Sequence, residues 1–288
     1  MCCWSGITGR SIHKRLEAAG IHEWDYVDPA LVRLHSEGRG MDWTKRNVEK
    51  NKDAVERVYR MLADEKSRKV FRAVLEHRMS HDLARIDAVY DKEQYFGNDV
   101  IPYAVGNFVD CGAFCGDTLK RFLDRKFLRG GIRGNYYAFE ADESNCSDIL
   151  SYCESEHMQN VSVYHLAVCD EKKTVSFKQD GSDIKVTGTI CEKQDENSIL
   201  VPGDSLDSVL GGTKVDMITM DIEGAEIQAL YGAQECIQTH HPKLAVSAYH
   251  ELEHLWEIPL LIHRMVPDYR IFYRHHCWNM YDTVCYAV

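Results

Sequence analysis

The stretch NFVDCGAFCGDT, residues 107–118, decides the fold of this chain. It opens with apolar residues that predict a short strand ending on Asp110, and it continues through a turn that contains Gly112 and Gly116. A helical pattern then begins at Asp117. A turn between a parallel strand and a helix presents free backbone N–H groups at the positive end of the helix dipole, which suits a nucleotide-like or carboxylate-bearing ligand.

The glycine spacing and the acid at the strand end narrow the choice of ligand. The glycines are spaced G-x-x-x-G, whereas a turn that binds a dinucleotide pyrophosphate typically reads G-x-G-x-x-G. The carboxylate of Asp110 would repel a diphosphate and attract an ammonium group. The pattern therefore favours an amino-acid-bearing nucleoside, and we predict that the ligand is S-adenosylmethionine.

Strand-like and helix-like segments alternate after this stretch. Apolar runs that predict further strands cover residues 136–140, 161–166, 200–202, 215–221, 244–250, 269–275 and 283–288. The last two runs flank a short polar turn, which predicts an antiparallel hairpin, and residues 173–192 predict an irregular hairpin or loop on the ligand face. The alternation is typical of an α/β fold with a doubly wound, mostly parallel sheet.

Residues 1–95 precede this pattern and predict a different arrangement. Val55, Val58, Tyr59 and Leu62 recur at the spacing of one helix face, and the apolar pattern continues to residue 79. We expect a helical N-terminal extension over residues 1–95 that forms a lid or covers an edge of a domain formed by residues 96–288. An independent N-terminal binding domain is the alternative, which we disfavour because about ninety residues of mixed helix is small.

Composition and charge restrict the partners of the chain. Hydrophobic residues at 44% and charged residues at 27% are typical of a soluble globular protein, and the net charge of −11 disfavours a surface that binds nucleic acid. No stretch approaches the roughly 20 apolar residues that span a membrane. The first twenty residues lack a continuous apolar core, and the eleven cysteines form no C-x-x-C pair, so we expect a cytoplasmic protein with reduced thiols. The oligomeric state stays open.

Polar side chains end the predicted parallel strands. These strand-end residues are Asp110, Glu140, Asp221 and His250. Because ligands bind at the C-terminal ends of the strands in such sheets, we expect the four side chains on one rim. An acid in the position of Glu140 can accept both hydroxyls of a ribose, and an ordinary surface glutamate is the alternative interpretation.

Four segments of the chain resemble a known family. VDCGAFCGDT, YAFEADESN, MDIEGAEIQALYGA and LAVSAYHELEHLWEIP occur in this order, and together they resemble the FkbM-type methyltransferases, which are class I S-adenosylmethionine-dependent enzymes. The resemblance covers residues 96–288 and departs from the family at Ala141, where a proline is common. It implies a Rossmann-like sheet of seven strands with a reversed last strand, and methyl transfer that is usually directed to a hydroxyl.

The resemblance and the strand-end positions together assign the cofactor site. The expected cofactor-binding residues are Asp110, Gly112, Phe114, Gly116, Thr118, Glu140 and Ala167. We expect Asp110 and the two glycines to hold the methionine part and Glu140 to hold the ribose. Ala167 is a weaker candidate beside the adenine, and for Phe114 and Thr118 packing or capping is the alternative.

Asp221, His250 and Glu223 are the predicted catalytic residues. Methyl transfer requires an aligned acceptor oxygen and removal of its proton, and the ordinary histidine pKa of about 6.5 suits a base at neutral pH. A magnesium-assisted reaction through Asp221 and Glu223 is the alternative. We favour a metal-free base because Mg²⁺ prefers oxygen ligands. A strand-end histidine that only bonds to the backbone is the structural alternative for His250.

The predicted function is O-methylation of a hydroxyl on a sugar, a glycan or a natural-product acceptor. A non-catalytic nucleoside-binding protein is an alternative from another class. A nicotinamide-dependent oxidoreductase is a further alternative, and the glycine spacing of residues 112–116 counts against it.

Overall fold

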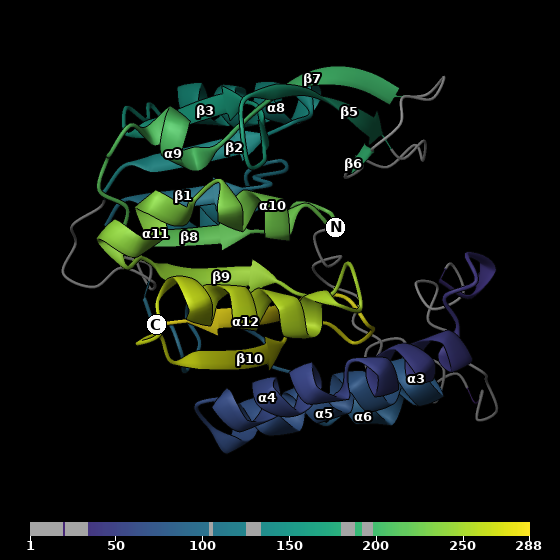
Figure 1. Cartoon of the computed structure of the whole chain (residues 1–288). Helices are drawn as coiled ribbons and strands as arrows, with labels where there is room; N and C mark the ends of the chain where they lie inside the picture. Colours follow the sequence, from purple (N-terminus) through teal and green to yellow (C-terminus); the bar gives the residue numbers. More distant parts are fainter. Residues whose placement is uncertain (1–19, 21–33, 104–105, 125–133, 180–187, 192–197) are drawn as a thin grey trace.

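A seven-stranded sheet in the order β10-β11-β9-β8-β1-β2-β3 forms the centre of the computed structural model (Figure 1). The structure describes residues 20, 34–103, 106–124, 134–179, 188–191 and 198–288. The strands are β1 (Phe108–Cys111), β2 (Tyr136–Glu140), β3 (Val161–His165), β8 (Met217–Met220), β9 (Lys243–Ser247), β10 (Ile271–His275) and β11 (Thr283–Ala287). All pairs are parallel except those of β11, which runs antiparallel to β9 and β10. The predicted fold class, with its reversed last strand, is confirmed.

Strand β1 lies inside the sheet, between β8 and β2, and is buried on both faces. All four of its residues are buried, as are all four residues of its neighbour β8. The ring of Phe108 stacks on that of Tyr136 in β2 with 5.2 Å between the ring centroids. A strand that is buried on both faces must carry apolar side chains at successive positions, which is why this short run predicts a central parallel strand.

Helices cover the sheet along its whole width. Those that follow the strands are α7 (Asp117–Leu123), α8 (Glu143–Ser155), α9 (Leu206–Leu210), α10 (Glu226–Tyr231), α11 (Gln234–His240) and α12 (His254–Met265). Figure 1 shows α10, α11 and α12 side by side over the same face. Within the described ranges, none of the helices combines the length and the apolar character that crossing a membrane requires.

A second, smaller sheet replaces the irregular segment that the sequence predicts over residues 173–192. It contains β4 (Ala167–Val168), β7 (Ser198–Asp204), β5 (Lys173–Gln179) and β6 (Gly188–Cys191) in the order β4-β7-β5-β6. The hairpin is present as β5 and β6, but β5 also pairs with β7 along six residue pairs. No local sequence pattern indicates that β5 and β7 pair with each other. Residues 180–187 and 192–197 lie outside the described residues.

In the described part of the chain, the helices that precede the sheet pack at its β10 edge (Figure 1). They are α3 (Met41–Lys50), α4 (Lys52–Met61), α5 (Glu65–Ser80) and α6 (Leu83–Asp87). The backbone N–H of Ala63 donates to the carbonyl of Ile271 in β10 at 2.8 Å. The guanidinium of Arg274, which is 1% exposed, pairs with Asp64 at 2.7 Å and with Asp99 at 2.8 Å. The predicted helices therefore cover an edge of the sheet, while the division of the chain at residue 95 stays a prediction.

The turn after β1 brings the backbone of Gly112 against the end of β8. Gly112 has a φ of +83°, and a Cβ atom at this position would lie 2.1 Å from the carbonyl oxygen of Asp221. Only glycine combines this left-handed conformation with so close an approach. Gly116, with a φ of +77°, then starts α7.

We expect Gly112→Ala to lower the free energy of unfolding by about 1–3 kcal/mol more than Gly212→Ala. Gly212 has a similar φ of +79°, but a Cβ there would meet no described atom within 4 Å, so it reports the conformational cost alone. Urea unfolding of both variants measures the difference. Equal losses in the two variants would show that the close approach of residue 112 to Asp221 is unimportant.

Candidate active site

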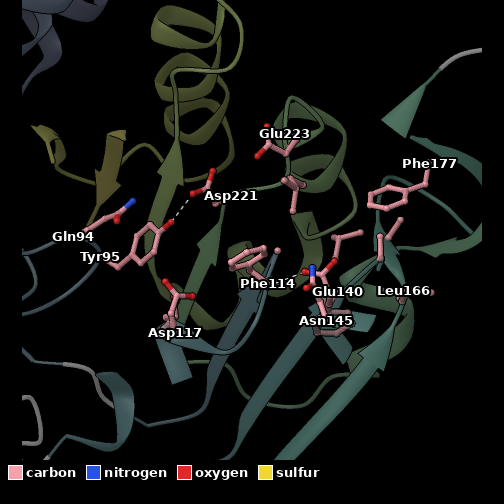
Figure 2. Close-up of a pocket in the computed structure, with 17 residues that line it drawn as sticks. Gln94, Tyr95, Phe114, Asp117, Glu140, Asn145, Leu166, Phe177, Asp221 and Glu223 are labelled. Carbon is pink, nitrogen blue, oxygen red and sulfur yellow. Dashed lines mark hydrogen bonds between the residues drawn. The ribbon is translucent and has the colours of Figure 1, made fainter. Parts of the chain in front are cut away.

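A cavity opens at the C-terminal ends of β1, β2 and β8, as Figure 2 shows. In the sheet, β2 and β3 lie on one side of β1, and β8 and β9 lie on its other side. This is the point of an α/β sheet at which ligands bind. The predicted site residues that line the cavity are Gly112, Phe114, Thr118, Glu140, Ala167, Asp221 and Glu223. Asp110, Gly116 and His250 are not among the described residues that line the cavity.

Glu140 joins the end of β2 to the turn after β1. Its Oε2 accepts the backbone N–H of Phe114 at 2.7 Å, and its Oε1 accepts that of Asp142 at 2.8 Å. Burial raises the pKa of the Glu140 carboxyl, against the lowering effect of these two hydrogen bonds. With only 8% of its surface exposed, Glu140 is no ordinary surface glutamate.

The cavity has an apolar part and a polar part on opposite sides of Glu140. Figure 2 shows Leu166 and Phe177 on one side, and Asp117 and Tyr95 on the other. The apolar part comes from the segment after β3 and from β5 of the second sheet. Four of these lining residues are not predicted from the sequence, although one of them begins the helix that residues 107–118 predict: Leu166, Phe177, Asp117 and Tyr95.

Asp110 is placed differently from its prediction. It is 2% exposed, and its carboxylate accepts hydrogen bonds from the Tyr136 hydroxyl and, at 2.7 Å, from Thr219 Oγ1. Burial raises its pKa to about 7, although both hydrogen bonds act in the opposite direction. The structure therefore does not support a direct contact between Asp110 and a ligand in the cavity. Gly116 likewise acts at the start of α7 and does not form part of the described wall of the cavity.

Two tyrosine hydroxyls hold Asp221 at the end of β8. Tyr95 donates to Oδ2 and Tyr249 donates to Oδ1, each at 2.8 Å. Tyr95 has a φ of +61°, and its backbone N–H donates to the hydroxyl of Tyr286 at 2.9 Å. The sequence does not predict the contact of Tyr95 with Asp221, because Tyr95 lies 126 positions before Asp221 in a segment without a motif.

Three carboxylates surround His250. Its Nδ1 lies 2.9 Å from Glu226 Oε1, and its Nε2 lies 3.3 Å from Glu223 Oε2 and 3.5 Å from Asp221 Oδ1. These contacts have the distance of ion pairs but not the angle of hydrogen bonds. Glu226 Oε1 also accepts the backbone N–H of Ile222 at 3.0 Å, so the same carboxylate holds the loop after β8.

The carboxylates determine the protonation of His250. Burial alone would lower its pKa, but Glu226 and Glu223 outweigh burial and raise the pKa well above the ordinary value. Glu223, which burial would make less acidic, instead has its pKa lowered to about 2 by His250. These carboxylates favour a proton on the ring, which disfavours His250 as the base, and its assignment as a catalytic residue stays a prediction. His250 also lies beyond Ser247, the last residue of β9, and its contacts are carboxylates rather than backbone.

Comparison with known proteins decides the family. The family model described as Methyltransferase FkbM domain matches residues 110–274, which is more than half of the chain. The chain belongs to the FkbM methyltransferase family. The FkbM domain therefore contains Glu140, Asp221, Glu226 and His250, whereas Tyr95 lies outside the matched residues.

A solved FkbM methyltransferase shares this fold. The methyltransferase FkbM from Methylobacillus flagellatus KT is 23% identical, with a TM-score of 0.73, over 97% of this chain and 70% of that chain. A fibrillarin from Aeropyrum pernix with natively bound S-adenosyl-L-methionine is 13% identical, with a TM-score of 0.40, over 67% of this chain and 70% of that chain. The first likeness establishes the fold alone, and the second is too distant to carry an argument. No curated protein matches the chain.

Asp110→Asn should change how the stability of the FkbM domain depends on pH. The pKa of Asp110 rises from 3.8 to about 7 on folding, so its contribution to stability is complete below pH 3.8 and is lost as the pH rises through about 7. Because asparagine stays neutral, the free energy of unfolding of the wild type should fall relative to the variant by on the order of 3 kcal/mol between about pH 4.5 and about pH 7.5. Denaturant unfolding at both pH values tests this. A constant difference between the two proteins would contradict the assignment.

Proposed function

We propose that this FkbM-family protein is an S-adenosylmethionine-dependent methyltransferase that methylates a hydroxyl of a sugar, a glycan or a natural product. The observation that carries the proposal is the order of groups along the cavity. An apolar part, the Glu140 carboxylate and a polar part follow one another (Figure 2). Adenine, ribose and a charged amino-acid end have the same order in S-adenosylmethionine.

The side chains fit the three parts of this cofactor. Leu166 and Phe177 offer apolar surface for the adenine ring, together with the predicted Ala167. A carboxylate has about four lone-pair directions, so Glu140 can accept ribose hydroxyls while it keeps its two backbone hydrogen bonds. Asp117 lines the polar part and takes the role beside the methionine ammonium that the sequence assigns to Asp110.

The residues beside the polar part suit a hydroxyl acceptor. The bound cofactor supplies a methyl group on a positively charged sulfur. Asp221 lines the cavity, and it can accept the proton of a hydroxyl that lies against it. The hydroxyls of Tyr95 and Tyr249 hold the two oxygens of Asp221 in place, so the carboxylate is oriented before the acceptor binds. In this proposal Asp221 is the base, and protonated His250 is not.

Glu140→Gln should weaken the binding of S-adenosylmethionine by roughly 10- to 100-fold, because a hydrogen bond to a charged group contributes about 1.5–3 kcal/mol. Isothermal titration calorimetry measures the dissociation constant. Glu154→Gln, at an exposed position of α8, is the matched control and should bind like the wild type. If the wild type shows no binding at millimolar cofactor, or if Glu140→Gln binds equally well, the proposed cofactor site is wrong.

Asp221→Asn should lower the turnover number by about 10²- to 10⁴-fold, because it removes the proposed base, and it should leave the affinity for S-adenosylmethionine within about tenfold. Transfer of a labelled methyl group to a panel of hydroxyl-bearing acceptors measures turnover. Asp268→Asn, at an exposed position, is the control. Cofactor binding by the wild type without transfer to any acceptor would favour the non-catalytic binding protein, and equal turnover of Asp221→Asn would exclude Asp221 as the base.

A further inference from the structure

A mixed group of nitrogen and oxygen ligands lies behind the cavity wall. Asp221, Glu226 and His250 each offer one ligand atom, and these atoms all lie within 4.8 Å of one another. They come from the end of β8, from α10 and from the segment after β9, so the fold brings together three segments that are distant in sequence. Asp221 belongs both to this group and to the wall of the cavity.

The ligand atoms of the group must draw together to surround one metal ion. In a tetrahedral site with metal–ligand distances of about 2.1 Å, neighbouring ligand atoms lie about 3.4 Å apart. His250 Nε2 is 3.5 Å from Asp221 Oδ1 and 3.3 Å from Glu223 Oε2, whereas Nδ1, at another corner of the ring, is 2.9 Å from Glu226 Oε1. Because only one nitrogen of an imidazole ring binds a given ion, the separations of at most 4.8 Å among Asp221, Glu226 and His250 must shorten when an ion binds.

The most buried members of the group lack hydrogen-bond partners. Both ring nitrogens of His250 and Oε2 of Glu226 find no hydrogen bond among the described residues. The side chain of His250 is 8% exposed and that of Glu226 is 0% exposed. Their charged neighbours lie at ion-pair distance without the geometry of a hydrogen bond, so the lone pairs of these buried atoms are suited to a cation.

The formal charges of the group also favour a cation. Asp221, Glu223 and Glu226 bring three carboxylates to the single imidazole of His250. His254 Nδ1 lies 3.2 Å from Glu226 Oε2 and adds a second imidazole at the far side. The carboxylate of Glu226 is fully buried and requires positive charge beside it, which a divalent cation can supply.

We propose that Asp221, Glu226 and His250 form a binding site for a divalent transition-metal ion, with Glu223 as a further oxygen ligand on the cavity side. Imidazole together with carboxylates favours ions such as Mn²⁺, Fe²⁺, Co²⁺ or Zn²⁺ over Mg²⁺, which prefers oxygen alone.

The surroundings of the group orient the ligands. Tyr95 and Tyr249 donate to Asp221, and the backbone N–H of Ile222 donates to Glu226. Carboxylates that ligate metals are typically held by such outer hydrogen bonds. The site is therefore supported by groups that leave part of each carboxylate available.

The role of the ion rests on the proposed function. An ion held by Asp221, Glu226 and His250 would supply Lewis-acid chemistry, because it would lower the pKa of an acceptor hydroxyl, whose proton would pass to water. The oxygen then forms a bond to the methyl carbon while the carbon–sulfur bond breaks and its electron pair stays on sulfur. The ion thus performs the task that the free Asp221 carboxylate has in the metal-free reaction.

Metal binding is measured on the full chain after metal removal, by calorimetry with MnCl₂, CoCl₂ and MgCl₂ in the absence of S-adenosylmethionine. We expect one Mn²⁺ or Co²⁺ ion per chain and at least tenfold weaker binding of Mg²⁺. Glu226→Gln and His250→Gln should each weaken Mn²⁺ binding more than tenfold. Glu257→Gln, at an exposed position of α12, should bind like the wild type.

The absorption spectrum of Co²⁺ identifies the ligands in the wild type, even if the buried variants do not fold. Nitrogen and oxygen ligands without a thiolate charge-transfer band support the site, whereas such a band assigns the ion to one of the eleven cysteines and overturns it. The absence of Mn²⁺ and Co²⁺ binding, tighter binding of Mg²⁺, or undiminished binding in both folded variants would also overturn it. Calorimetry with S-adenosylmethionine on the same sample keeps the test of the cofactor site separate.

Discussion

The buried carboxylate of Glu226 holds together the segments after β8 and β9, which form one side of the cavity. One oxygen accepts the backbone N–H of Ile222 in the loop after β8 and lies against His250 in the segment after β9. The other oxygen lies against His254 at the start of α12. Glu226 is fully buried, and a buried charge that loses its partners is strongly destabilising. The loop after β8 and the segment after β9 must therefore stay beside Glu226, and this fixes the position of Asp221.

The two halves of the site have different physical characters. On the β1–β2 side, backbone N–H groups and Glu140 form a polar centre, and the apolar wall comes from the second sheet. On the β8–β9 side, charged groups compensate one another around His250.

The part of the chain before the sheet also reaches the β8–β9 side of the cavity. Arg78 of α5 donates to the carbonyl of Tyr249, and Arg39 pairs with Glu251. The part of the chain before the FkbM domain therefore supports the active-site segments directly.

Much of the fold and part of the site follow from the sequence. Strand β1 and its glycine turn, the acid at the end of β2 and Asp221 after β8 are readable because each lies within a few residues of a strong local pattern. The second sheet was missed, because β5 pairs with β7 across a long connection. Asp110 was assigned to the ligand because it ends a strand, but Tyr136 and Thr219 surround its carboxylate. A strand-end position alone does not indicate where a side chain finds its partners.

The sequence by itself determined the α/β class, the glycine turn at residues 112–116 and the family, because these depend on local periodicity and on contiguous motifs. Only the tertiary structure decided the chemistry of the acidic and basic groups. The sequence predicts a base with an ordinary pKa at His250, whereas Glu226 and Glu223, which lie beside it in space, raise this pKa and favour the protonated ring. Tyr95 enters the site from outside the FkbM domain for the same reason. The charge and reactivity of a buried group depend on its neighbours, and the neighbours here are joined by folding rather than by sequence.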